Sequence, residues 1–125
     1  MRLPALLLCS TLAIAAAPST LKVTATAYCD GGTTQSGTKA RTGIVAADPK
    51  VLPVGTVLQI LDGPHSGVYT VMDTGSAVKG RRIDIFMPDC PAAEQFGLRK
   101  LRVRVLRHGW NPKATDLATE TTARK

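Results

Sequence analysis

The sequence predicts a mainly β protein, a single small domain in which six short strands form a barrel, with one short helix. Runs rich in β-branched residues, each bounded by Gly, Pro, Asp or Ser, recur along the chain. Several short strands with turn signals between them are typical of barrels and sandwiches. The predicted strands cover residues 22–28, 43–47, 56–60, 67–72, 82–86 and 101–106.

The predicted helix lies between the fifth and sixth strands. Asp89 suits the N-cap, Pro91 suits the first turn, and Gly97 suits the position after the last turn. Residues 62–67, Asp-Gly-Pro-His-Ser-Gly, predict a hairpin connection between the third and fourth strands. Residues 31–42 are rich in Gly, Thr and Ser, which predicts a mobile loop.

The N-terminal segment has the features of a secretory signal. A basic start precedes an apolar run with an Ala-x-Ala site, so we expect residues 1–17 to be removed. The apolar run is shorter than the ~20 residues of a membrane span, so no integral membrane segment is expected after signal removal. Acylation of Cys9 as in a lipoprotein is the alternative, and it is a poor match because that Cys lies so early in the run.

The C-terminal segment, residues 108–125, is polar and Thr-rich. It has too little apolar surface to order itself, which predicts a flexible tail with Trp110 as its only candidate anchor. Residues 21–107 therefore make up the predicted domain, which is near the size at which a core alone gives marginal stability. With the signal, these features predict an exported protein, in the periplasm, the cell envelope or the medium.

Two cysteines remain after signal removal, Cys29 and Cys90. Because an exported chain meets an oxidising compartment, a disulfide between them is the expected pairing. A zinc site is a weaker alternative, since His65 and His108 have no metal-ligand spacing. A catalytic thiol is also a weaker alternative, because neither His lies in a recognisable sequence motif for a Cys–His pair. No metal is predicted.

Three aspartates stand in small-residue frames beside predicted strands: Ala47-Asp48-Pro49, Met72-Asp73-Thr74-Gly75 and Ile83-Asp84-Ile85. Asp is disfavoured in strands, so we expect these carboxylates to have a specific structural or functional role. The segment between Asp73 and Asp84 is short, so it could place the strand that carries Asp84 beside the strand that ends at Asp73. A carboxylate cluster is then possible, and such clusters separate pKa values for acid and base work.

Several motifs, in order along the domain, resemble the bacterial three-aspartate (3D) domain. The resemblance implies a double-psi β-barrel, a fold shared with membrane-bound lytic murein transglycosylase A and small muralytic stationary-phase proteins. It also implies an envelope glycan as substrate, and no cofactor. The motifs are Thr26-Ala27-Tyr28, Ile44-Val45-Ala46-Ala47-Asp48-Pro49, Leu52-Pro53-Val54-Gly55-Thr56, Met72-Asp73-Thr74-Gly75, Val78-Lys79-Gly80-Arg81-Arg82-Ile83-Asp84-Ile85 and Phe96-Gly97 followed by Val103-Arg104-Val105-Leu106.

By this resemblance Asp84 corresponds to the catalytic acid of the lytic transglycosylases of this fold, Asp73 to the neighbouring active-site Asp, and Asp48 to the third aspartate of the signature. In such enzymes one carboxylic acid protonates the glycosidic oxygen between N-acetylmuramic acid and N-acetylglucosamine. As carboxylate it then takes the proton of the sugar's C6 hydroxyl, and a 1,6-anhydro product results. Apolar neighbours and a second carboxylate should keep Asp84 protonated.

The candidate substrate-binding residues are Tyr28, Thr74, Gly75 and Lys79. Tyr28, with Tyr69 and Phe86, is also a candidate sugar platform. Purely structural or solvent-exposed roles are the alternatives for three of the site residues. Asp48 could simply hold a turn, Asp73 could cap a strand end, and Lys79 could be a solvated surface residue.

Charge favours an anionic partner. The formal net charge is +7, and the last strand carries a stripe of basic residues, although a solvated strand face is the alternative. Peptidoglycan stems carry carboxylates. Nucleic acid is not predicted, since no recognition motif is present and aromatic residues make up only 4% of the chain. The stripe consists of Arg99, Lys100, Arg102, Arg104 and Arg107.

Two further functions compete with a transglycosylase. The single Asp-Thr-Gly copy also resembles an aspartic protease loop, which would work only in a homodimer. The second is a noncatalytic envelope-glycan-binding module of the same fold, because Ser76 replaces a common second Gly and no counterpart of the domain that completes the glycan groove is seen. The sequence thus predicts a secreted enzyme that cleaves glycosidic bonds of peptidoglycan, with glycan binding alone as the alternative.

Overall fold

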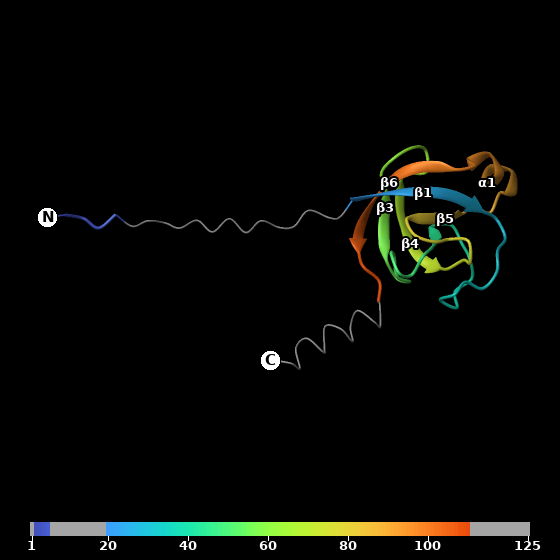
Figure 1. The fold of residues 1–125 in the computed structure, drawn as a ribbon, viewed down its shortest axis with the longest axis horizontal. Helices are drawn as coiled ribbons and strands as arrows, with labels where there is room; N and C mark the ends of the chain where they lie inside the picture. Colours follow the sequence, from blue (N-terminus) through green and yellow to red (C-terminus); the bar gives the residue numbers. More distant parts are fainter. Residues whose placement is uncertain (1, 6–19, 111–125) are drawn as a thin grey trace.

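Six strands close into a barrel in the computed structural model, which describes residues 2–5 and 20–110. Their order around the barrel is β1-β5-β2-β4-β3-β6 (Figure 1). The prediction of a six-stranded barrel with one helix is confirmed. The elements are β1 (Thr20–Tyr28), β2 (Ile44–Ala47), β3 (Val57–Ile60), β4 (Gly67–Asp73), β5 (Arg82–Phe86), α1 (Cys90–Phe96) and β6 (Arg99–Arg107).

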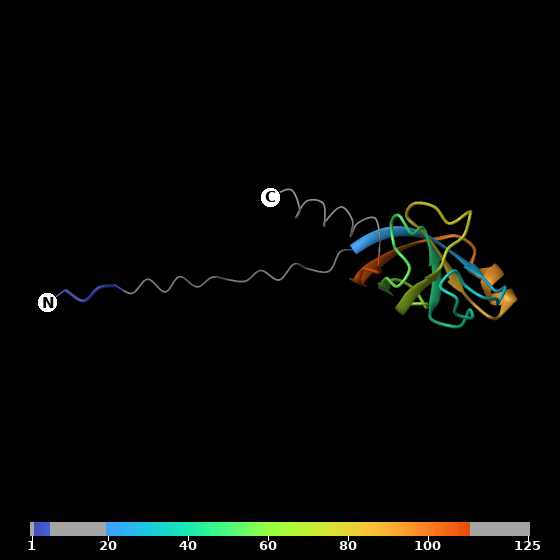
Figure 2. The same cartoon turned by 90° about the horizontal axis from the view of Figure 1, so that it is seen from below.

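The barrel has an internal twofold arrangement. β1 pairs with β5 and β2 pairs with β4 in parallel, while the four other pairs are antiparallel. Exchanging each strand with the one three places away in sequence leaves the order around the barrel unchanged. The two halves therefore interlock as in a double-psi barrel, which confirms the predicted fold. Closure also leaves no unpaired sheet edge among the six described strands. Figure 2 shows the same barrel turned by 90°.

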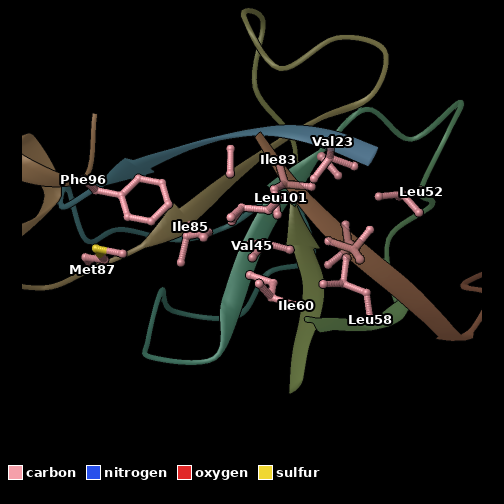
Figure 3. Packing of buried hydrophobic residues seen from close by; sticks show 14 of the residues in the cluster. Val23, Val45, Leu52, Leu58, Ile60, Ile83, Ile85, Met87, Phe96 and Leu101 are labelled. Atoms are coloured by element: carbon pink, nitrogen blue, oxygen red, sulfur yellow. The ribbon is translucent and has the colours of Figure 1, made fainter. Parts of the chain in front are cut away.

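The core follows from alternation along the strands. In β5, Ile83 and Ile85 point into the barrel while Asp84 between them is on the outer face, half-buried. Fully burying an aliphatic side chain stabilises the fold by roughly 1.5–3 kcal/mol. Figure 3 shows Ile83 and Ile85 among the packed side chains, together with Val23, Val45, Leu52, Leu58, Ile60, Met87, Phe96 and Leu101.

Helix α1 is tied to the end of β1. Cys29 and Cys90 form a disulfide with a Cα–Cα distance of 5.1 Å, which confirms the predicted pairing. Gly97 ends the helix with a φ of 60°, in the region that favours glycine. Asp89 occupies the N-cap position as predicted, but its side chain makes no capping hydrogen bond.

The two predicted loops differ in outcome. Residues 62–67 join antiparallel β3 and β4, as predicted, and the Tyr69 hydroxyl donates to the carbonyl of His65 (2.8 Å). Residues 31–42 were predicted to be a mobile loop. They form a small hairpin around a bridge between Thr33 and Lys39, and the hydroxyl of buried Thr34 donates to the carbonyl of Thr38.

The predicted termini fall largely outside the described residues, which include neither residues 6–17 of the signal nor residues 111–125 of the tail. Trp110, the predicted anchor, is 73% exposed. The chain is held one residue earlier, where the Gly109 amide donates to the hydroxyl of Thr56 (2.9 Å). A Cβ at Gly109 would overlap the Val54 carbonyl oxygen, so only glycine fits. No helix within the described part of the chain is long and apolar enough to cross a membrane.

Candidate active site

A row of neighbouring residues crosses four strands on the outer face of the barrel. Thr26 on β1 is opposite Asp84 on β5, Asp84 is opposite Ala46 on β2, and Ala46 is opposite Asp73 on β4. Adjacent strands lie about 4.8 Å apart, so the two Asp backbones are separated by roughly 10 Å. Since only the methyl group of Ala46 stands between them, both carboxylates face one hollow.

A β-bulge brings Asp73 to this face. The parallel register of β2 and β4 shifts after Val45, which is opposite Val71, so that Ala46 is opposite Asp73 and Met72 is the extra residue. Val71 is fully buried, and strict alternation would therefore direct Asp73 back toward the core. The bulge avoids that burial of a charge and aims the carboxylate outward.

Asp84 lies in a half-buried environment that shifts the pKa of its carboxyl. Burial raises the pKa of its carboxyl above the ordinary value, and the nearby Asp73 charge acts in the same direction. The Thr26 hydroxyl, which donates to Asp84 Oδ1 (3.1 Å), and the charge of Arg82 oppose this shift. The net effect is that the pKa of Asp84 is raised.

Asp73 is held by backbone donors. Its Oδ1 accepts the amides of Gln35 and Thr74, each at 2.9 Å. Gln35 belongs to the 31–42 hairpin, and the next amide of that hairpin, Ser36, donates to the carbonyl of Met72 (3.1 Å). The hairpin therefore satisfies a carbonyl of the bulge and orients the carboxylate at the same time.

Tyr28 completes the polar wall. Its hydroxyl lies 3.5 Å from Asp73 Oδ2, and its ring meets Phe86 edge-on with centroids 5.4 Å apart. Burial, followed by the charges of Asp73 and Asp84, raises the pKa of Tyr28 to about 12. The phenol thus remains a hydrogen-bond donor at neutral pH.

These residues line an open pocket of about 170 Å³, here called the Asp73–Asp84 pocket. Of the predicted site residues it brings together Tyr28, Asp73, Thr74, Gly75 and Asp84. Small-molecule sites in proteins measure about 300 to 1,000 Å³, so this pocket is smaller than a typical small-molecule site.

Sequence reasoning missed three lining residues, Asp30, Ala46 and Val78. Ala46 was within a quoted motif, but its place between two carboxylates depends on strand register. Val78 is buried because a turn returns its amide to the carbonyl of Gly75 (3.0 Å). Asp30 had a signal in the sequence, since it directly follows Cys29, the disulfide cysteine that comes immediately after β1.

Asp48 and Lys79 lie outside the pocket. Asp48 is buried, and its Oδ1 and Oδ2 accept the amides of Lys50 (3.0 Å) and Gly80 (2.8 Å). These two hydrogen bonds lower the pKa of Asp48. Lys79 is exposed, and its charge acts on Asp48 rather than in the pocket. Asp48 therefore links the end of β2 to the loop that leads into β5.

Replacing Asp48 by Asn is expected to destabilise the fold at neutral pH. Asn keeps one acceptor oxygen, so one of the two backbone amides loses its partner, and the melting temperature should fall by roughly 5 °C or more. Because the folded pKa is lowered, the Asp48 contribution is present above the ordinary Asp value of about 3.9 and is lost as the pH falls through the folded value. Thermal melts of both proteins from pH 7 to pH 3 measure this.

Asp89→Asn is the matched control, because the Asp89 side chain makes no capping hydrogen bond and its replacement should leave the melting temperature nearly unchanged at pH 7. A structural role for Asp48 is contradicted if the Asp48→Asn and Asp89→Asn melts coincide at pH 7.

The profile of the 3D domain family matches residues 43–107, a segment that includes Asp48, Asp73 and Asp84. The chain belongs to the 3D domain family. A curated relative of this 3D domain protein is the cell wall-binding protein YocH of Bacillus subtilis (strain 168), 40% identical over 98 residues. That match covers 69% of this chain and 32% of YocH, so the chain spans about a third of the relative's length.

Solved structures share the barrel of this 3D domain protein. MltA from Escherichia coli, a lytic transglycosylase, superposes with a TM-score of 0.50 at 25% identity, over 62% of this chain and 28% of MltA. A structure of MltA with bound chitohexaose gives a TM-score of 0.53 at 22% identity, over 65% and 29%. The Streptomyces papain inhibitor gives a TM-score of 0.55 at 14% identity over 71% of this chain and 96% of its own, which reflects the fold alone.

Proposed function

We propose that this 3D domain protein cleaves the glycan strands of peptidoglycan as a lytic transglycosylase, at the bond between N-acetylmuramic acid and N-acetylglucosamine. The observation that carries the proposal is the half-buried Asp84 carboxyl, whose pKa is raised by burial and which opens onto the same pocket as Asp73. Membership of the 3D domain family and the shared barrel of MltA support it.

In the proposed reaction Asp84 is both acid and base. Its carboxyl proton passes to the glycosidic oxygen as the bond from that oxygen to C1 of the muramic acid breaks. The C6 hydroxyl oxygen of the same sugar then bonds to C1, and its proton returns to the Asp84 carboxylate. The products are a 1,6-anhydro sugar and a free 4-hydroxyl, and no water is consumed.

The other pocket residues stabilise and position the substrate. Asp73, held by the amides of Gln35 and Thr74, places negative charge toward the oxocarbenium-like transition state. Tyr28, Thr74 and Gly75 line the same pocket and contact the sugar in the proposed complex. Asp48 acts as a positioning residue, because it holds the loop before β5 at Gly80.

Incubation of purified sacculi with the full chain, followed by mass spectrometry of the soluble products, tests the reaction. We expect anhydro-muropeptides, 18 Da lighter than hydrolysis products because no water is added. Reducing-end muropeptides alone would show hydrolysis instead. An unchanged digest would contradict an enzymatic function.

Glycan binding without cleavage is the second candidate. The small volume and openness of the Asp73–Asp84 pocket favour it, as does the name of YocH, which describes wall binding. Co-sedimentation with sacculi from which no products are released would support the binding module.

We also propose that the protein acts outside the cytoplasm, in the periplasm, the cell envelope or the medium. The Cys29–Cys90 disulfide supports this, since such bonds persist in oxidising compartments. The expected removal of residues 1–17 is part of the same proposal.

A further inference from the structure

A second hollow lies on the outer face of the barrel, where the first half of β1, the residue before β5 and the start of β6 come together. Its volume is about 200 Å³. Three of its five lining residues are cationic, and they come from three separate segments. We call it the basic cleft, and its residues are Lys22, Val23 and Thr24 of β1, Arg81 just before β5, and Lys100 of β6.

The cations of the basic cleft have no acidic counterpart. Across the β1–β6 ladder Lys22 is opposite Arg102, and like charges directly opposite each other destabilise a sheet. Asp62 neutralises Arg102 (2.7 Å). Within residues 20–110, no carboxylate lies within ion-pair distance of Lys22, Arg81 or Lys100. These charges therefore produce a local positive potential that attracts anions.

The basic cleft is adjacent to the Asp73–Asp84 pocket. Thr24, in the cleft, and Thr26, which donates to Asp84, are two residues apart on the same face of β1. Two residues of a strand span about 7 Å. The Thr24 amide also donates to the carbonyl of Arg81 (2.9 Å), which fixes the cleft to the start of β5. One ligand can therefore reach both hollows.

We propose that the basic cleft binds the carboxylates of the peptide stem carried by the muramic acid residue in the Asp73–Asp84 pocket. The proposal rests on the proposed function. An extended residue spans about 3.5 Å, so a free carboxylate on the second residue of a stem lies about 7 Å from its sugar, which matches the distance from Thr26 to Thr24. The protein thus recognises stem-bearing peptidoglycan, not glycan alone.

The test compares glycan strands that keep their stems with strands stripped of stems by an amidase. The cleft variant combines Lys22→Gln, Arg81→Gln and Lys100→Gln. Because each exposed charge contributes modestly, it should bind stem-bearing strands roughly tenfold more weakly than the native chain at low salt. On stripped strands the two should bind equally.

A charge-matched control combines Arg41→Gln, Lys50→Gln and Arg107→Gln, three exposed positions outside both hollows. It removes the same net charge and should bind stem-bearing strands like the native chain. Equal losses in the cleft and control variants would overturn the proposal, because they would indicate attraction by net charge alone. Thermal melts of both variants verify folding.

Soluble stem peptides separate this proposal from the proposed function. Suppose the native chain does not bind stripped strands but binds free stem peptides, and the cleft variant loses that binding. This result would support the assignment of the basic cleft and contradict glycan binding in the Asp73–Asp84 pocket. If the cleft variant instead loses binding only to a phosphodiester wall polymer or to DNA, with stem peptides bound as before, the cleft is a polyphosphate site and the proposal is overturned.

Discussion

Asp84→Asn is expected to abolish turnover of peptidoglycan while the protein stays folded. The amide has nearly the same shape and still accepts the hydrogen bond from Thr26, but it cannot deliver or recover a proton. General acid–base groups contribute roughly 100-fold to 10,000-fold, so the release of anhydro-muropeptides should fall at least about 100-fold. Co-sedimentation with sacculi should be unchanged.

The same substitution has a predictable effect on stability. The folded pKa of Asp84 is raised, so its protonated form stabilises the fold below the ordinary Asp value, and that stabilisation is lost as the pH rises through the folded value. Asn resembles the protonated side chain at every pH. The melting temperature of Asp84→Asn should therefore match the native protein in acid and be no lower at neutral pH.

Asp30→Asn is the matched control for the catalytic role, because Asp30 also lines the pocket but is exposed. It should retain most of the activity. Full activity of Asp84→Asn, or loss of activity only in Asp30→Asn, would show that the acid was assigned to the wrong carboxyl. An unfolded Asp84→Asn protein would indicate a structural role for this side chain.

Removal of the disulfide is expected to give the largest loss of stability. Cys29 and Cys90 are 61 residues apart, and closing a loop of that length reduces the entropy of the unfolded chain by an amount worth roughly 4 kcal/mol. For a domain of this size the melting temperature should fall by roughly 15 °C or more. A thermal melt of the Cys29→Ser, Cys90→Ser double variant measures this.

Thiol counting provides the control. The full chain has three cysteines, so denaturing alkylation without reductant should label only Cys9, and alkylation after reduction should label all three. Reductant should shift the melt of the native protein but not that of the double variant. Three labelled thiols before reduction would contradict the disulfide in the purified protein.

The disulfide also affects the site. It joins the first residue of α1 to the residue that follows β1, between Tyr28 and Asp30 in the pocket wall. The double variant should therefore lose some glycan affinity at temperatures where it is still folded, because this wall is no longer held against the helix.

The barrel was largely predictable because its signals are local. Alternation in β5 places Ile83 and Ile85 inside and Asp84 outside, and Gly97 ends the helix by its own conformational freedom. The Cys29–Cys90 disulfide was predictable because only these two cysteines remain after signal removal, and an oxidising compartment favours a bond between them. The family motifs then supplied the double-psi order, which no pattern of alternation specifies.

The loop at residues 31–42 shows the limit of composition. Its Gly, Thr and Ser residues predicted a loop, but they did not indicate that Thr34 is buried or that the amide of Gln35 donates to Asp73. The stabilising groups are backbone donors and a carboxylate 38 residues away. Residue type does not reveal partners of that kind.

What the sequence by itself determined was the set of strands, the helix, the cysteine pair and the two aspartates that share the pocket, since hydrophobic alternation and residue chemistry are properties of short segments. The tertiary structure alone decided how they meet. The bulge after Val45 turns Asp73 to the outer face, Ala46 separates it from Asp84, and Asp48 is directed to the Gly80 amide instead of the pocket. The reason is physical, because register and hydrogen-bond partners depend on strands that are distant in sequence, and a one-residue shift exchanges the two faces of a strand.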